Sequence, residues 1–384
     1  MKDHNQINNP PVREFINGAE AIARAAVDSG CNFFSGYPIT PATQILIHMA
    51  AELPKGGGIA IQAEDEISAI GYCIGAAMAG ARVMTATSGP GISLYSENIG
   101  LAIMGEVPLV IIDCQRMGPA TGGATTVAQG DIQFIRWGTS GGYPIIALSP
   151  TSVADSYSLT CHAFDLAERF RVPVFIVTDK ETVTTRVTVN CELISEYDAR
   201  SKKTIPEVDE FIPYHFDDLA DIPLMSPMGG AHIVRFTTSS HDERGYLSKD
   251  PSIVGRMNQH LSEKIVKYIE QITLVDEDLQ AGADTLFISY GITSQSVKEA
   301  VRGARENGHK VSALTIISLW PVPEEQILNA MEGVKRVVVP ELNLGQYCLE
   351  IERLARDELE VVGVHRVDGE LISPKEILQG GTIR

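Results

Sequence analysis

Short apolar runs alternate with amphipathic helical stretches between residues 16 and about 180, and this alternation predicts βαβ units around a parallel sheet. In the helical stretch 152–169, for example, large side chains recur at spacings of four, four and three from Val153, which places them on one face. We therefore expect an α/β domain with a six-stranded parallel sheet over residues 1–190. The predicted strands are 32–36, 59–62, 82–88, 109–113, 143–148 and 172–177.

A second α/β pattern begins near residue 284 and predicts a smaller, doubly wound domain over residues 284–384. Its predicted strands are 285–290, 311–317 and 336–340, and its predicted helices are 293–307 and 323–331.

Residues 191–283 separate the two patterns and follow a strand-like alternation at 182–190. Within this part, residues 192–222 carry nine Asp and Glu against three Arg and Lys, so we interpret them as an acidic, solvated connector. Residues 229–251 are rich in Gly, Ser and charge, which predicts an ordered loop or a partner contact.

Composition narrows the possible functions. The formal net charge of −18 makes nucleic-acid binding and electrostatic attachment to an anionic membrane poor hypotheses. No run of about eighteen apolar residues occurs and the N-terminus has no apolar signal segment, so we expect a soluble chain that stays in the cytoplasm. The six cysteines are far apart, which excludes a zinc ribbon or a ferredoxin-type cluster held by this chain and fits a reducing compartment.

Two short motifs resemble known sites but stand in the wrong context. Residues 138–142 satisfy G-x-S-x-G, yet a predicted helix precedes them and a strand follows, which is the reverse of a nucleophile elbow. Residues 303–310 resemble a phosphate-binding loop but lie at the end of a predicted helix. Since no G-x-G-x-x-G follows the first strand, a nicotinamide dehydrogenase is also a poor fit.

Three other segments lie just past predicted strands, where open parallel sheets bind their ligands. The first, 36–41, reads GYPITP, and its two prolines would fix the Thr40 hydroxyl and the Tyr37 ring in a rigid turn. The same residues are also compatible with a simple helix start, in which Thr40 is the N-cap and Pro41 the first helical residue.

The second and third segments carry charge. Glu64, Asp65 and Glu66 begin an apolar helix, where acids are favoured by the helix dipole but could also exchange a proton with a bound heterocycle. Arg116 opens a glycine-rich loop, and its planar guanidinium suits a substrate carboxylate, although it could equally pair with a nearby acid.

Together the segments resemble the α subunits of the 2-oxoacid:ferredoxin oxidoreductases, which depend on thiamine diphosphate. The resemblance covers nearly the whole chain, and YPITP followed by Q-x-E is its most specific part. QGD and RWGT look most like the 2-oxoglutarate branch. The matching stretches are NGAEAIARAAVDSGCNFFSGYPITP, QAEDEISAIGYCIGAAMAGARVMTATSGPG, DCQRMGPATG, QGDIQFIRWGT, ALSPTSV, HDERG and VPELNLGQ.

The resemblance implies a fold and roles for single residues. The first domain would be the pyrimidine-binding domain and the second a transketolase C-terminal-like α/β domain. Glu64 would hydrogen-bond to N1′ of the aminopyrimidine, and Pro38 and Ile39 would lie against this ring. Thr40 and Arg116 would hold the 1-carboxylate of the 2-oxoacid, with Tyr37 lining the pocket.

The resemblance also implies a partner. No signature for Mg²⁺ and diphosphate and no cysteine set for a [4Fe-4S] cluster occurs in this chain, so both would lie on a β subunit, in an assembly such as (αβ)2. The expected reaction converts 2-oxoglutarate and coenzyme A to succinyl-CoA and reduces ferredoxin. Pyruvate or a branched-chain 2-oxoacid as substrate, and more remotely a non-catalytic subunit, remain alternatives.

Overall fold

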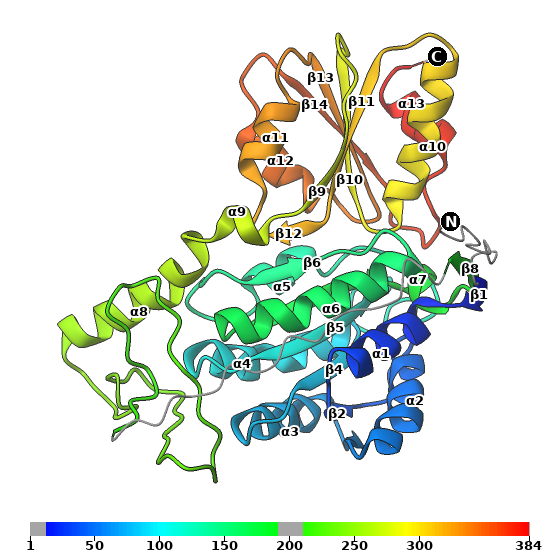
Figure 1. The fold of residues 1–384 in the computed structure, drawn as a ribbon. Coiled ribbons are helices and arrows are strands. Elements are labelled where there is room, and N and C mark those ends of the chain that lie inside the picture. Colours follow the sequence, from blue (N-terminus) through cyan, green and yellow to red (C-terminus); the bar gives the residue numbers. More distant parts are fainter. Residues whose placement is uncertain (1–12, 191–209, 384) are drawn as a thin grey trace, which may run out of the picture.

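The computed structural model describes residues 13–190 and 210–383, so residues 192–209 of the acidic connector 192–222 lie outside this part. Figure 1 shows a large sheet with flanking helices and a smaller sheet above it. The large sheet has seven strands in the order β12-β6-β7-β5-β4-β2-β3. Its six parallel members confirm the six predicted strands: β2 (Phe33–Gly36), β3 (Ile59–Gln62), β4 (Val83–Thr87), β5 (Leu109–Gln115), β6 (Ile146–Leu148) and β7 (Pro173–Asp179).

The seventh strand is a correction to the predicted six. Residues Ser318–Trp320, after the third strand of the smaller sheet, form β12 and pair antiparallel with β6. A three-residue strand is too short to show an alternating pattern, so nothing in the sequence marked it.

Both faces of the large sheet are covered, which explains why its strands are apolar on successive positions. Side chains of α1 (Gly18–Asp28), α2 (Thr43–Glu52) and α6 (Val153–Phe170) pack on one face, with the short turn η1 (Leu53–Gly56) after α2. On the other face lie α3 (Glu66–Met78), α4 (Gly89–Met104) and α5 (Ile132–Trp137).

The smaller sheet has the order β14-β13-β10-β11-β9, with β9 antiparallel to β11 and the others parallel. The predicted strands are confirmed as β10 (Thr285–Tyr290), β11 (Val311–Ile316) and β13 (Arg336–Glu341), and the predicted helices as α10 (Thr293–Glu306) and α11 (Glu324–Ala330). The elements without a prediction are β9 (Val275–Asp278), α12 (Cys348–Leu354), β14 (Glu360–His365) and α13 (Pro374–Gly380).

One hydrophobic core joins the two sheets. The cluster that contains Ile111 and Phe175 of the large sheet continues through Leu319 and Trp320 to Leu286 of the small one. The Trp320 Nε1 also donates to the Ile132 carbonyl at 3.3 Å. The two domains therefore meet through packed apolar side chains and not through a linker alone.

The strand predicted from the alternation at 182–190 is confirmed only in its second half. β8 (Val187–Asn190) pairs with β1 (Arg13–Ile16), but residues 182–184 belong to the short helix α7 (Lys180–Thr184). The Asp179 side chain accepts from the Thr182 N–H at 2.9 Å, and this N-cap favours a helical turn over an extended strand.

Residues 210–283 contain α8 (Pro251–Val266), α9 (Ile269–Ile272) and the strand β9, besides loops. This part is tied to the first domain by a buried ion pair between Lys264 Nζ and Glu106 Oε2, at 2.8 Å. The Arg171 side chain adds hydrogen bonds to the carbonyls of Pro213, Pro223 and Leu224. Across the described ranges, no helix has both the length and the apolar character needed to cross a bilayer.

Candidate active site

The three segments singled out by sequence begin at one edge of the large sheet. The strands β5, β4, β2 and β3 are neighbours in the sheet and run parallel. Their carboxyl ends therefore lie side by side, and the loops that follow them share one edge. Tyr37 follows β2, Glu64 follows β3 and Arg116 follows β5.

Two predicted site residues are in direct contact. The Arg116 Nη1 donates to the Thr40 carbonyl oxygen at 2.6 Å, and the Arg116 side chain is buried. The Arg116 Nε is also buried and reaches no acceptor among the described residues. A guanidinium has five N–H donors, so most of them stay available for an anion. Arg116 forms no ion pair with an acid in the described ranges.

The Thr40 side chain is not a helix cap. Helix α2 begins at Thr43 with Ala42 as its N-cap, and no side chain caps it. Thr40 itself is exposed, as is Tyr37, while Pro38 and Ile39 are half-buried. Ile39 packs against the core under α1 and α2. The rigid turn therefore keeps one apolar anchor in the core and leaves the Thr40 hydroxyl and the Tyr37 ring at the sheet edge.

The three acids after β3 have different environments. Asp65 is the N-cap of α3: its carboxylate accepts from the Ser68 N–H at 2.7 Å in a capping box, which is the helix-start role. Glu64 is exposed, and no described residue donates a hydrogen bond to it. Glu66 is 7% exposed, in the first turn of α3.

Glu66 lies beside the end of β4. A Cβ added at Gly91 would come within 2.7 Å of Glu66 Cγ and 1.9 Å of Thr87 Oγ1, so glycine at this position leaves room for both side chains. No described residue donates a hydrogen bond to the Glu66 carboxyl group. The signal for Glu66 was present in the sequence, because it lies one helical turn before Ala69 and Ile70 on the buried face of α3.

Buried carboxyl groups at the same edge went unnoticed in the sequence. Asp113, in β5, is buried, and Asp131, just before α5, is half-buried with its Oδ2 atom buried; their carboxyl groups lie within hydrogen-bonding reach of each other. Burial raises the pKa of Asp131 to about 6, and burial together with Asp131 raises the pKa of Asp113 well above its usual range.

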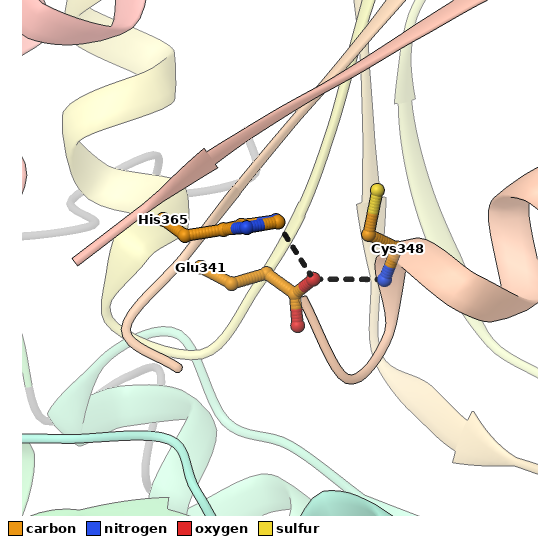
Figure 2. A group of neighbouring side chains, drawn as sticks. All are labelled: Glu341, Cys348 and His365. Carbon is orange, nitrogen blue, oxygen red and sulfur yellow. Dashed lines mark hydrogen bonds and ion pairs between the residues drawn. The ribbon is translucent and has the colours of Figure 1, made fainter. Parts of the chain in front are cut away.

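A group of potential metal ligands lies away from this edge, in the second domain. Figure 2 shows the Glu341 carboxylate between His365 and Cys348. This carboxylate already accepts hydrogen bonds from the Tyr347 and Cys348 N–H groups and the Tyr290 hydroxyl. Burial, and then Glu341, raises the pKa of the Cys348 thiol to about 12, which opposes the thiolate that a metal needs. We therefore assign Glu341 to holding the turn between β13 and α12.

Both misleading motifs have the predicted context. Gly138 directly follows helix α5, where a nucleophile elbow would need a strand, so the G-x-S-x-G stretch is no nucleophile elbow. Gly308 follows the end of α10 with a φ of 85°, which is the expected conformation of a helix C-terminus.

The fold and this edge define an α/β protein with candidate ligand-binding groups at the carboxyl ends of its parallel strands. Residues 24–257 match the family described as pyruvate flavodoxin/ferredoxin oxidoreductase, thiamine diphosphate-binding, and residues 283–377 match pyruvate:ferredoxin oxidoreductase core domain II. The chain belongs to this 2-oxoacid:ferredoxin oxidoreductase family.

Similar proteins indicate which branch of the family this chain resembles most. The chain is 43% identical to the 2-oxoglutarate synthase subunit KorA of Methanocaldococcus jannaschii, over 95% of this chain and 98% of that protein. The KorA subunit of Methanothermobacter thermautotrophicus is 41% identical, over 95% and 96% of the two chains. From the same organism, the ketoisovalerate oxidoreductase subunit VorB is 32% identical over 95% of this chain and 96% of that one.

A solved structure matches the fold along nearly the whole chain. The 2-oxoglutarate:ferredoxin oxidoreductase from Magnetococcus marinus, solved with 2-oxoglutarate, coenzyme A and succinyl-CoA bound, matches with a TM-score of 0.89 and 30% identity. The match covers 97% of this chain but 65% of that longer chain. A split-gene transketolase, with a TM-score of 0.55 and 13% identity, shares the fold alone.

Proposed function

We propose that this chain is a subunit of a thiamine-diphosphate-dependent 2-oxoacid:ferredoxin oxidoreductase, and that 2-oxoglutarate is its substrate. The identity of 43% with a 2-oxoglutarate synthase subunit, over nearly the full length of both chains, is the observation that carries the proposal. The lower identity of 32% with a ketoisovalerate oxidoreductase subunit keeps a branched-chain 2-oxoacid as the alternative substrate. The expected reaction forms succinyl-CoA and reduces ferredoxin.

The residues at the sheet edge fit an aminopyrimidine. A buried carboxyl group with no internal donor, at the start of α3, suits a ring nitrogen that exchanges a hydrogen bond with it. Bound thiamine diphosphate would supply the nucleophilic carbon and the electron sink for decarboxylation. Glu64, the acid chosen from the sequence, stays a prediction, while burial favours Glu66 for this role. Pro38 and Ile39 offer the apolar surface for the ring.

Arg116 and Thr40 are proposed to bind the 1-carboxylate of the 2-oxoacid. Arg116 keeps unpaired N–H groups, and its bond to the Thr40 carbonyl fixes the plane of the guanidinium. The exposed Thr40 hydroxyl and Tyr37 ring lie in the same turn and would line the pocket. In a protein with a net charge of −18, Arg116 also provides local positive charge for an anionic substrate.

A β subunit is proposed to complete the site. It would supply the Mg²⁺ and diphosphate contacts and the [4Fe-4S] cluster, in a cytoplasmic (αβ)2 assembly that binds coenzyme A and passes electrons to ferredoxin. The sequence supports this division, because its six cysteines are widely separated and cannot hold such a cluster in one short motif.

The test compares three substrates with one preparation. The chain is co-expressed with its partner subunit, and dye reduction is measured with 2-oxoglutarate, pyruvate and 3-methyl-2-oxobutanoate in the presence of coenzyme A. We expect the highest kcat/KM with 2-oxoglutarate. A higher value for 3-methyl-2-oxobutanoate would favour the alternative substrate, and no turnover of any of the three would reject the proposed function.

A further inference from the structure

The neighbouring carboxyl groups of Asp113 and Asp131, called the carboxyl pair from here on, have three buried oxygen atoms that the proposed reaction does not explain. Asp113 is fully buried, yet neither of its oxygens receives a hydrogen bond from a donor in the described residues. Asp131 Oδ2 is also buried and receives no hydrogen bond from a described residue. A buried acceptor without a donor is costly, so native proteins rarely keep one. The group within hydrogen-bonding reach of each carboxyl is the other carboxyl.

One shared proton resolves this arrangement. Two carboxylates in a dry site repel each other, and a single proton between them removes the repulsion and supplies the missing donor. The pair then carries one negative charge. The raised pKa of Asp113 and that of Asp131 agree in direction with such a pair.

The pair stands next to the proposed carboxylate-binding arginine. Arg116 is three positions beyond Asp113, and its charge lowers the pKa of Asp131 against the stronger effect of burial. No ion pair within 4.0 Å joins Arg116 to either acid in the described part of the chain. The charges therefore attract each other over more than hydrogen-bonding distance. This attraction can orient the guanidinium and leaves its N–H donors available. Arg116 and the pair together are electrically neutral before a substrate binds.

The other charged groups at this edge do not replace either member. Asp179, at the end of β7, accepts from the Thr182 N–H and hydroxyl and has its own role as a cap. Glu66, at the start of α3, lies near Gly91 together with Thr87, the residue that pairs with Asp113 in the sheet. Arg116 is the cation that acts on Asp131.

The second domain places Asp131. The turn Gln129-Gly130-Asp131 is bound from one side by the loop after β13: Asn343 Nδ2 donates to the Gln129 carbonyl at 2.7 Å, and Gln346 Nε2 to the Gly130 carbonyl at 2.6 Å. From the other side, the Asp131 N–H donates to Gln115 Oε1 at 3.1 Å. Asp131 is therefore fixed between β5 and the second domain.

We propose that Asp113 and Asp131 share one proton and, as a pair with a single negative charge, position Arg116 for the substrate carboxylate. Both are positioning residues, because they act through Arg116. The inference rests on the proposed function for the identity of the anion that Arg116 binds. It also gives the second domain a part in substrate binding, through the turn that holds Asp131.

The test uses the complex of this chain with its partner subunit and the variants Asp113→Asn, Asp131→Asn and the double variant. In each single variant, the new amide can donate to the remaining carboxylate, so one negative charge is kept. We expect the KM for 2-oxoglutarate to rise at most about threefold in the single variants and at least about tenfold in the double variant, with a smaller effect on kcat. Asp179→Asn, which removes a neighbouring buried carboxyl outside the pair, should leave this KM unchanged.

Two kinetic results would overturn the proposal. One is a double variant with the wild-type KM, and the other is a single variant as impaired as the double variant. Thermal unfolding of each variant complex shows whether the fold is kept. If the double variant fails to assemble, the two single variants and Asp179→Asn still test the proposal. A KM more than tenfold above the wild-type value in both single variants would contradict the shared charge.

Infrared spectroscopy tests the proton directly and does not need turnover. The wild-type complex at neutral pH should show the C=O stretching band of a protonated carboxyl group, and this band should be lost in either single variant. A band that persists in both would contradict a shared proton. This measurement keeps the failure of the carboxyl pair distinct from a failure of the proposed function, which would appear as no turnover of any 2-oxoacid by the wild type.

Discussion

Arg116 Nη1 donates a 2.6 Å hydrogen bond to the carbonyl oxygen of Thr40, and this bond joins two segments that are 76 positions apart in the sequence. Thr40 lies in the turn after β2, and Arg116 lies in the loop after β5, with β4 between the two strands. The contact uses the backbone of Thr40, so the Thr40 hydroxyl stays free to take part in binding.

Glu66→Gln and Glu64→Gln form a matched pair of variants, because the two acids are two positions apart and differ mainly in burial. We expect Glu66→Gln to lower kcat by about 10²- to 10⁴-fold, the usual contribution of a positioned proton-exchanging group. Glu64→Gln should stay within about threefold of the wild type. Dye reduction at saturating thiamine diphosphate measures both. The reverse order would restore Glu64, the acid chosen from the sequence.

Replacing Arg116 should act on substrate binding. Arg116→Lys keeps the charge but loses the planar set of donors, so we expect the KM for 2-oxoglutarate to rise about tenfold or more. A smaller change is expected in kcat. Arg302→Lys is the control, because Arg302 pairs with Glu299 and Glu306 on the exposed face of α10. An unchanged KM in Arg116→Lys would remove Arg116 from the substrate site.

Gly91 should tolerate no side chain. In Gly91→Ala, the new methyl group would lie 1.9 Å from Thr87 Oγ1 and 2.7 Å from Glu66 Cγ, so these side chains must move. Overpacking of this kind costs about 1–3 kcal/mol of stability, and we expect kcat to fall as Glu66 is displaced. Gly75 lies in α3, and a Cβ added there would meet no atom within 4 Å. Gly75→Ala should therefore stabilise α3 by about 0.5–1 kcal/mol. Thermal unfolding and dye reduction compare the two, and equal behaviour would refute the steric argument.

Lys264→Met should destabilise the attachment of residues 210–283. Lys264 is fully buried against the buried Glu106, so its loss removes the lysine from a buried carboxylate and leaves it the His260 contact at 3.2 Å, at a cost of about 3–5 kcal/mol. Lys267→Met, one helical turn further on, removes a pair with the exposed Asp218 and should cost less than about 1 kcal/mol. Urea unfolding followed by fluorescence gives both values. Adding Glu106→Gln to Lys264→Met should recover part of the loss, and no recovery would contradict the buried charge of Glu106 as its cause.

Asp179 should make stability depend on pH in mildly acidic solution. Burial raises its pKa to about 6, from an ordinary value of 3.8. Between these values the folded chain binds the proton more tightly than the unfolded chain, so stability falls as the pH rises from about 4 to about 6. Asp179→Asn keeps an N-cap for α7 but does not titrate, and its unfolding free energy should show a smaller fall over this range. An identical pH dependence of variant and wild type would contradict this assignment.

Much of the fold could be predicted from local patterns. Five of the six parallel strands of the large sheet are buried on both faces, so they are continuous apolar runs that stand out from their surroundings, while β3 at the sheet edge is partly exposed. In contrast, α8 is amphipathic but lies within a charged part of the chain, and β12 is three residues long. Neither has a local signal strong enough to be separated from a loop.

The site was predictable only as far as single segments. Arg116 and Thr40 are sequence candidates because each follows a strand, and parallel strands bring such positions to one edge. The choice between Glu64 and Glu66 depends on which of them faces the core, and that is set by the exact first residue of α3. Asp113 and Asp131 were not selected, because burial and mutual proximity are properties of the folded chain and have no local sequence pattern.

The short strand Ser318–Trp320 means that the protein cannot be divided at the boundary between its two sheets. A fragment that ends near residue 283 would lack β12, and its strand β6 would become a bare edge with unpaired N–H and C=O groups. The complementary fragment would expose Leu319 and Trp320, which the first domain now covers. Two domains by topology are therefore a single unit for expression, folding and degradation.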